Sequence, residues 1–129
     1  MNIVQMLKAL GDETRIRIVN ILREGPLCVC EIEAILDISQ SNASRHLSKL
    51  MNANIVTYYK EAKYVYYKLD KDTLSNYSFL NMLLEKDLIL EERLKYDYDI
   101  LVQYKEAGLD CENVFKIKDI INKGANKWK

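Results

Sequence analysis

The stretch that decides the fold spans residues 28–69 and reads CVCEIEAILDISQSNASRHLSKLMNANIVTYYKEAKYVYYKL. The spacing of its apolar residues predicts one helix over residues 28–36 and, after a three-residue turn, a second helix. Ser39 is suited to cap this second helix, which we expect to run to about Ala53, because a serine oxygen accepts a backbone N–H there. Residues 55–69 are rich in β-branched and aromatic side chains around a polar middle, which is typical of a β-hairpin. The order predicts a helix-turn-helix followed by a hairpin.

The segments on both sides of this stretch have a helical pattern. Before it, apolar residues predict two helices separated by Gly11, with Asp12 as the N-cap of the second. After Asp70, apolar residues mark long helical segments, and residues 114–121 indicate one more amphipathic helix. The fold class is therefore mainly α with a β-hairpin wing, in which one short helix supports a second that enters the DNA major groove.

Composition narrows the functional classes. With 129 residues, 49% hydrophobic and 29% charged, the chain fits one globular domain. It has neither an apolar run of membrane-spanning length nor a signal-peptide pattern, so we expect a cytoplasmic protein without a membrane partner. Neither paired carboxylates, a nucleophile with a base, nor a phosphate loop stands in a suitable setting, which argues against an enzyme. Three cysteines in a reducing compartment favour ligands, redox groups or core residues over a disulfide framework.

The net charge of the whole chain is zero, but one segment of it is basic. From Ser39 to Leu69, five basic side chains accompany one acid, a local charge of +4, as phosphate contact requires. The start of the second helix adds polar side chains that can reach base edges or phosphates. The residues expected to contact DNA are Gln40, Ser41, Asn42, Ser44, Arg45, His46 and Lys49 on this helix, and Lys60 and Lys63 at the hairpin tip. The hairpin tyrosines can stack on single-stranded bases, but cross-strand pairing is the favoured interpretation.

Three segments resemble the ArsR or SmtB-type repressors over about residues 1–107. They read LKALGDETRIRIV (7–19), LCVCEI (27–32) and SQSNASRHLSKL (39–50). The resemblance implies a winged helix-turn-helix DNA-binding and dimerisation domain at 1–107, a homodimer through the first and late helices, and a double-stranded operator that is released on inducer binding. It leaves residues 108–129 as a C-terminal extension. Asn54 and Ala62 depart from the family, which usually has glycine at these positions.

Cys28 and Cys30 open the first helix of the motif, and an ideal helix would rotate them about 200° apart. One ion then holds both only if the helix start unwinds, which would couple binding to movement of the DNA-reading helix. A helix N-terminus is also expected to lower thiol pKa values, and thiolates select soft ions. In the alternative interpretation, Cys28 and Cys30 are only small buried residues of the core. The resemblance of residues 27–32 to the family's motif favours inducer binding instead.

A third ligand is less evident. Arsenic sensors of the family often have a third cysteine where this chain has Glu33, so we hypothesise that Cys111 completes a metal site with Cys28 and Cys30, from the same chain or a partner. Three thiolates suit trivalent arsenic or antimony as inducer, and no cofactor is expected for DNA binding. Cys111 as an unremarkable core or surface thiol stays open.

Other ions and other sensing chemistry are weighed against this hypothesis. Cadmium, lead or zinc is less favoured because each usually takes a fourth ligand or an oxygen donor. The resemblance also implies a late-helix metal site that needs histidine, and no histidine lies near Asp97 and Asp99 in the sequence. The single histidine, His46, has no neighbouring ligands on its predicted helix, so DNA contact or helix capping is favoured. A repressor that senses oxidants through the same cysteines is the alternative function.

Overall fold

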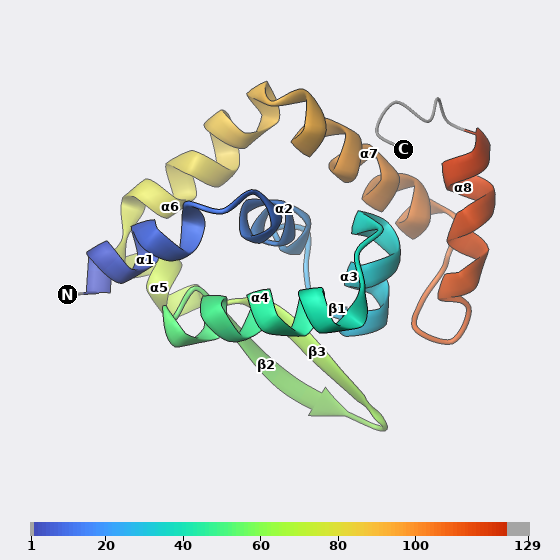
Figure 1. Ribbon diagram of the computed structural model, residues 1–129, viewed down its shortest axis with the longest axis horizontal. Coiled ribbons are helices and arrows are strands. Elements are labelled where there is room, and N and C mark those ends of the chain that lie inside the picture. Colours follow the sequence, from blue (N-terminus) through green and yellow to red (C-terminus); the bar gives the residue numbers. More distant parts are fainter. Residues whose placement is uncertain (1, 124–129) are drawn as a thin grey trace.

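The computed structural model describes residues 2–123, so residues 124–129 of the predicted C-terminal extension lie outside the described part. Helices surround one core, and a small antiparallel sheet lies at its edge (Figure 1). The helices are α1 (Asn2–Leu10), α2 (Glu13–Leu22), α3 (Val29–Leu36), α4 (Gln40–Asn52), α5 (Lys71–Asn76), α6 (Ser78–Met82), α7 (Glu92–Glu106) and α8 (Ile117–Lys123). The strands are β1 (Leu27–Cys28), β2 (Val56–Glu61) and β3 (Tyr64–Leu69).

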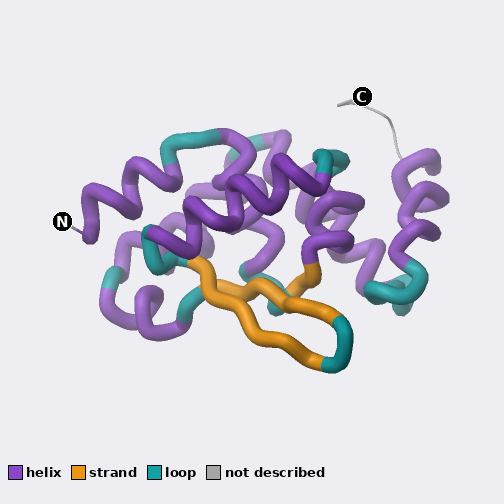
Figure 2. Tube along the Cα trace, turned by 60° about the horizontal axis from the view of Figure 1, so that its bottom comes forward, coloured by secondary structure: helices purple, strands orange, loops and turns teal. Residues whose placement is uncertain are grey.

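The predicted helix-turn-helix consists of α3, the turn at 37–39 and α4. Asp37 ends α3 in the left-handed region at φ 56°, and the Ser39 side chain accepts the Asn42 N–H at 3.2 Å, which caps α4 as expected. Asp12 caps α2 in the same way, accepting the Arg15 N–H at 3.0 Å. The hairpin of β2 and β3 projects from this motif as a wing (Figure 2), so the predicted fold class is confirmed.

One strand is absent from the sequence-based prediction. The pattern predicts a helix from Cys28, whereas β1 places Cys28 in extended backbone at φ −81° and ψ 166°, and α3 begins at Val29. β1 pairs with β3, with Leu27 opposite Tyr67 and Cys28 opposite Tyr66. The pairing partners lie about 40 residues away in sequence, so no local pattern reveals them. The sheet order β1-β3-β2 joins the start of α3 directly to the wing.

The hairpin tyrosines pair across the strands. The rings of Tyr59 and Tyr66 stack with centroids 5.5 Å apart, and those of Tyr58 and Tyr67 lie 6.2 Å apart. Each pair is directly opposite in the register of β2 and β3. This confirms the structural interpretation of these residues over stacking on single-stranded bases. At the hairpin tip, Ala62 adopts a left-handed φ of 55°.

The segment after the wing is less regular than the long helices predicted for it. A π-helical turn (Leu83–Asp87) and a 3₁₀ turn (Leu88–Leu90) join α6 to α7, and a second 3₁₀ turn (Val114–Lys116) precedes α8. Several large apolar side chains stay exposed in the single chain. They are Ile3, Val4 and Leu7 on α1, Met82 at the end of α6, Ile89 and Leu90 between α6 and α7, Tyr58 and Tyr59 on the wing, and Phe115 before α8.

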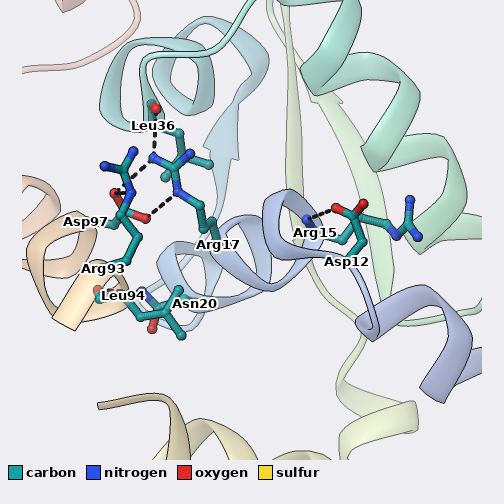
Figure 3. A network of polar contacts seen from close by, with 8 residues as sticks. All are labelled: Asp12, Arg15, Arg17, Asn20, Leu36, Arg93, Leu94 and Asp97. Atoms are coloured by element: carbon teal, nitrogen blue, oxygen red, sulfur yellow. Dashed lines mark hydrogen bonds and ion pairs between the residues drawn. The ribbon is translucent and has the colours of Figure 1, made fainter. Parts of the chain in front are cut away.

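A buried ion pair ties α2 to α7 (Figure 3). The Arg17 guanidinium donates to the Asp97 carboxylate from Nε at 2.7 Å and from Nη2 at 3.1 Å, and Nη2 also donates to the Leu36 carbonyl at 2.8 Å. Burial raises the pKa of Asp97, although the hydrogen bonds and charge of Arg17 act in the opposite direction. Three helices therefore share one polar contact at the centre of the molecule.

Candidate functional site

Three sulfur atoms gather at the start of α3. The Sγ atoms of Cys28, Cys30 and Cys111 all lie within 4.8 Å of one another. Cys28 comes from the end of β1, Cys30 from the first turn of α3, and Cys111 from the turn that follows α7. Cys28 and Cys30 are 2.9 Å apart at their sulfurs, and a disulfide joins Cys28 to Cys111. The structure thus brings together, within one chain, all three residues hypothesised as ligands.

The expected conflict between the cysteine spacing and an intact helix does not exist in the structure. Because Cys28 is the extended N-cap residue rather than part of α3, its side chain is free of the 100° helical step that would turn it away from Cys30. The two sulfurs therefore face the same side with the helix intact. The prediction that one ion reaches both only after the helix start unwinds is wrong.

The expected lowering of thiol pKa values is also wrong for Cys30. Burial raises the pKa of this thiol, and the nearby carboxylates of Glu31 and Glu33 raise it further. Only the backbone N–H groups at the helix start act in the expected direction. Burial, together with local acidic charge, outweighs the helix terminus here, so Cys30 carries less thiolate at neutral pH than a free cysteine.

A buried carboxylate lies beside the sulfurs. The side chain of Glu31 accepts the Cys28 N–H at 3.0 Å through Oε1 and the Tyr104 hydroxyl at 2.5 Å through Oε2. Cys111 Sγ lies 3.5 Å from the same Oε1 atom. Glu31 is only 3% exposed, and Tyr104 on α7 is fully buried. Burial, together with the hydrogen bond to Glu31, raises the pKa of Tyr104, so its hydroxyl stays a donor.

The turn that carries Cys111 also contacts the wing. Cys111 Sγ lies 3.8 Å from the hydroxyl of Tyr66, the residue that pairs with Cys28 in the sheet. Next to it, Glu112 accepts the Tyr64 hydroxyl at 2.9 Å and lies 3.6 Å from the Lys63 ammonium. The hydrogen bond to Glu112 raises the pKa of Tyr64 to about 12. The sulfur cluster is therefore attached to α3, α7 and the wing.

Most side chains expected to contact DNA line an exposed face of α4 and the hairpin tip. Those exposed to solvent are Gln40, Ser41, Asn42, Ser44, Arg45, Lys49, Lys60 and Lys63. Asn42 Oδ1 accepts a hydrogen bond from the Arg45 guanidinium at 3.0 Å, which holds both polar groups on the same helix face. The amide and guanidinium groups needed for base-edge contacts are thus displayed together.

His46 differs from the other helix residues because it is buried, at 5% exposure. Its Nδ1 atom accepts from the Arg15 guanidinium at 3.1 Å and lies 3.8 Å from the Asp12 carboxylate. Burial lowers the pKa of His46; the nearby Asp12 raises it, and the cations Arg45, Arg15 and Lys49 lower it further. The structure places this side chain between α4 and the start of α2, facing away from the exposed helix face.

Sequence reasoning missed the residues that hold the cluster in place. Glu31 reads locally as an acid near a positive helix N-terminus, and Tyr104 as one apolar position of a late helix. A signal for Glu31 was present, since a glutamate three residues after an N-cap position can accept the N-cap N–H as half of a capping box. No local signal connects Glu31 to Tyr104, which lies 73 residues away.

The chain is similar to known bacterial regulators. Residues 12–58 match the family described as "Bacterial regulatory protein, arsR family". The cadmium resistance transcriptional regulatory protein CadC homolog of Staphylococcus aureus is 45% identical over 73 residues, 56% of this chain and 60% of that protein. The arsenical resistance operon repressor of Bacillus subtilis (strain 168) is 32% identical over 96 residues, 74% of this chain and 86% of that repressor.

A solved structure shows the same fold. The transcriptional regulator HlyU from Vibrio vulnificus CMCP6 matches with a TM-score of 0.55 and 37% identity, over 63% of this chain and 82% of that one. The sequence match spans less than two thirds of the staphylococcal relative, and 51–57% of two further arsenic resistance regulators. Among residues 2–123, no helix is both long and apolar enough to cross a bilayer.

Proposed function

Because the chain belongs to the arsR family of bacterial regulatory proteins, whose members regulate transcription and are not enzymes, we propose that it is a dimeric repressor released from operator DNA by trivalent arsenic or antimony. The inducer binds the thiolates of Cys28, Cys30 and Cys111. The observation that carries this proposal is the gathering of three sulfurs, from residues up to 83 positions apart, within 4.8 Å of one another. The names of the relatives, arsenical and cadmium resistance regulators, support a metal or metalloid inducer.

The donor set favours a trivalent ion. Trivalent arsenic and antimony form pyramidal complexes with three sulfurs, because a lone pair occupies the remaining position. Zinc and cadmium usually take a fourth ligand, most often sulfur or nitrogen. The only histidine of the chain, His46, is buried against Asp12 and Arg15 on another part of the fold, so it cannot supply that nitrogen. Since metalloid binding needs thiolates, the Cys28–Cys111 disulfide must first be reduced.

The position of the cluster supports a coupling between ion binding and DNA binding. The cluster lies at the N-terminus of α3, and α3 packs against α4, the helix that enters the major groove. Cys111 adds a contact to the wing through its neighbour Glu112. Drawing three sulfurs around one ion shifts these elements relative to one another. Such coupling is typically about 1–3 kcal/mol, or about 5- to 150-fold in operator affinity.

The DNA interface is expected on α4 and the wing. We expect Arg45 and Asn42 to contact base edges, and the wing lysines Lys60 and Lys63 to contact phosphates; their exposure and the Arg45–Asn42 hydrogen bond support this. A homodimer is expected through α1 and the late helices; the exposed apolar residues of α1 and of the segment before α7 support this. A dimer would present two α4 helices to two half-sites of one operator.

The test measures operator affinity with and without arsenite. A duplex selected for binding from a random library is labelled with a fluorophore, and anisotropy is followed under a phosphine reductant, which carries no thiols to compete for arsenite. We expect arsenite to weaken binding of the wild-type protein at least fivefold. Cys111→Ser should bind the duplex normally but lose most of the arsenite response. An unchanged wild-type affinity would refute the proposal, and a fully responsive Cys111→Ser would remove Cys111 from the site.

The Cys28–Cys111 disulfide favours one alternative, a repressor that senses oxidants. Its formation by hydrogen peroxide would oxidise two thiols, transfer two electrons to the peroxide and release two waters. The same anisotropy assay separates the two functions. Release of the duplex by peroxide, with no effect of arsenite under reducing conditions, would establish the redox function instead.

A further inference from the structure

In the described part of the chain, Glu31 is unusual among the buried charged residues because no cation there forms an ion pair with it. Arg17 and Asp97 are buried together and pair with each other. Among the side chains of residues 2–122, no lysine, arginine or histidine forms an ion pair with Glu31, and its contacts there are the Cys28 N–H, the Tyr104 hydroxyl and Cys111 Sγ. Its negative charge is therefore held by neutral donors in a site that little water reaches.

This charge lies next to the sulfurs of the proposed inducer site. Glu31 Oε1 is 3.5 Å from Cys111 Sγ, and the Cys28 N–H binds the same oxygen. Three thiolates around a trivalent ion form a neutral complex, whereas three thiolates around a divalent ion keep one negative charge. Like charges at this separation repel strongly where water is excluded. The neutral complex avoids this repulsion, and the divalent complex does not.

We propose that Glu31 is a specificity-determining residue, whose unbalanced negative charge favours trivalent over divalent ions at Cys28, Cys30 and Cys111. This rests on the proposed function and names the basis of its ion choice. The carboxylate acts from beside the ion and is not a ligand. Both of its oxygens are engaged, Oε1 by the Cys28 N–H and Oε2 by the Tyr104 hydroxyl, and a trivalent ion with three sulfurs leaves those hydrogen bonds in place.

The competing arrangement makes Glu31 an oxygen ligand for a divalent ion. Oε1 would then have to leave the Cys28 N–H at the buried start of α3. The two arrangements predict opposite effects when the charge is removed. Without the charge, a divalent ion should bind more tightly if Glu31 repels it, and less tightly if Glu31 coordinates it.

The experiment compares arsenite and cadmium binding to the full-length reduced protein. Each ion is titrated while sulfur-to-metal charge-transfer absorbance is recorded, with a competing dithiol for arsenite and a competing chelator for cadmium. Glu31→Gln removes the charge and keeps an oxygen for the Cys28 N–H. Glu31→Met is a second neutral variant of similar size, so the comparison stands if either one folds, as judged by circular dichroism. Glu106→Gln, exposed near the end of α7, is the control for the same change in net charge.

We expect the neutral Glu31 variants to shift the ratio of cadmium to arsenite affinity about tenfold or more toward cadmium, which corresponds to about 1.4 kcal/mol. Glu106→Gln should leave the ratio as in wild type. An unchanged ratio in the Glu31 variants, or a shift toward arsenite, would overturn the inference while leaving the proposed function intact. Binding of neither ion by the reduced wild-type protein would overturn the proposed function, and this inference with it.

Discussion

Replacing Asp97 with alanine leaves the Arg17 guanidinium buried without its carboxylate partner. Two hydrogen bonds, of 2.7 and 3.1 Å, are lost, and only the bond to the Leu36 carbonyl at 2.8 Å is kept. The Asp97 side chain is 1% exposed and that of Arg17 9%, so water cannot replace the missing partner. Breaking a buried pair in this way typically costs about 3–5 kcal/mol.

The expected loss is large relative to the whole stability of a domain, which is about 5–15 kcal/mol. At about 2.1 cal/mol/K per residue, a chain of 129 residues unfolds with an entropy of about 0.27 kcal/mol/K. A loss of 3–5 kcal/mol then lowers the melting temperature by about 11–18 °C. Urea unfolding followed by circular dichroism measures the free energy directly. All variants are compared at one protein concentration, because the stability of a dimer depends on it.

Two control variants isolate the unpaired charge as the cause. Asp99→Ala removes an exposed carboxylate from the same helix and should change stability by less than about 0.5 kcal/mol. The double variant Arg17→Met with Asp97→Leu removes both charges and should recover most of the loss, since apolar replacements of a buried pair are often neutral. If the free energy of unfolding of Asp97→Ala lies within about 1 kcal/mol of the wild-type value, the buried ion pair does not stabilise the fold to the expected extent.

Three further predictions concern other parts of the fold. Burial and nearby cations lower the pKa of His46 in the folded state, so the contribution of this residue to stability is present above about pH 6.5 and is lost as the pH falls through the folded pKa. His46→Gln should therefore make the free energy of unfolding in urea depend less on pH below about pH 7. An unchanged pH dependence would contradict this. Ala62→Gly should stabilise the wing by about 0.5–1 kcal/mol, because Ala62 has a left-handed φ of 55°, which glycine adopts without strain. The control Ala107→Gly, at φ −75°, should not stabilise the protein. A less stable Ala62→Gly variant would show that the left-handed backbone at Ala62 carries no strain. Leu90→Asp, at a position 76% exposed in the single chain, should weaken the proposed dimer at least tenfold in sedimentation equilibrium, and an unchanged dimer would place the interface elsewhere.

Elements governed by neighbouring residues were predictable from the sequence. Asp12 and Ser39 each accept the N–H of the third following residue, and this geometry depends only on local backbone. The β-branched and aromatic residues around a polar middle in the same way located the hairpin that contains Ala62. The cysteines were recognised as a possible set because three thiols are few and two of them lie in a family motif. These features need no knowledge of the rest of the fold.

Features that depend on distant partners were not predictable. β1 has two residues, too few for any periodic pattern, and exists because β3 offers it a pairing edge. The resulting extended backbone at Cys28 brings the side chains of Cys28 and Cys30 together, whereas an ideal helix would turn them about 200° apart. The burial that raises the pKa of Cys30, and the burial of Glu31, arise likewise from neighbours that folding brings together, whereas the carboxylates of Glu31 and Glu33, which also raise this pKa, are local in sequence. The burial of His46 depends on the position of α2, which lies about 30 residues earlier.

Because Cys28 pairs with Tyr66, a movement of the sulfur cluster tilts the wing at its base and moves the hairpin tip by a larger distance. From Tyr66 to the tip at Ala62 the strand extends four residues, or about 13 Å at about 3.3 Å per residue. A tilt of about 5° at the base moves the tip by about 1 Å, which exceeds the range of about 0.5 Å over which a hydrogen bond length normally varies. Lys60 and Lys63 lie at that tip. A rearrangement too small to alter the secondary structure at the base would thus be large enough at the hairpin tip to break the proposed phosphate contacts.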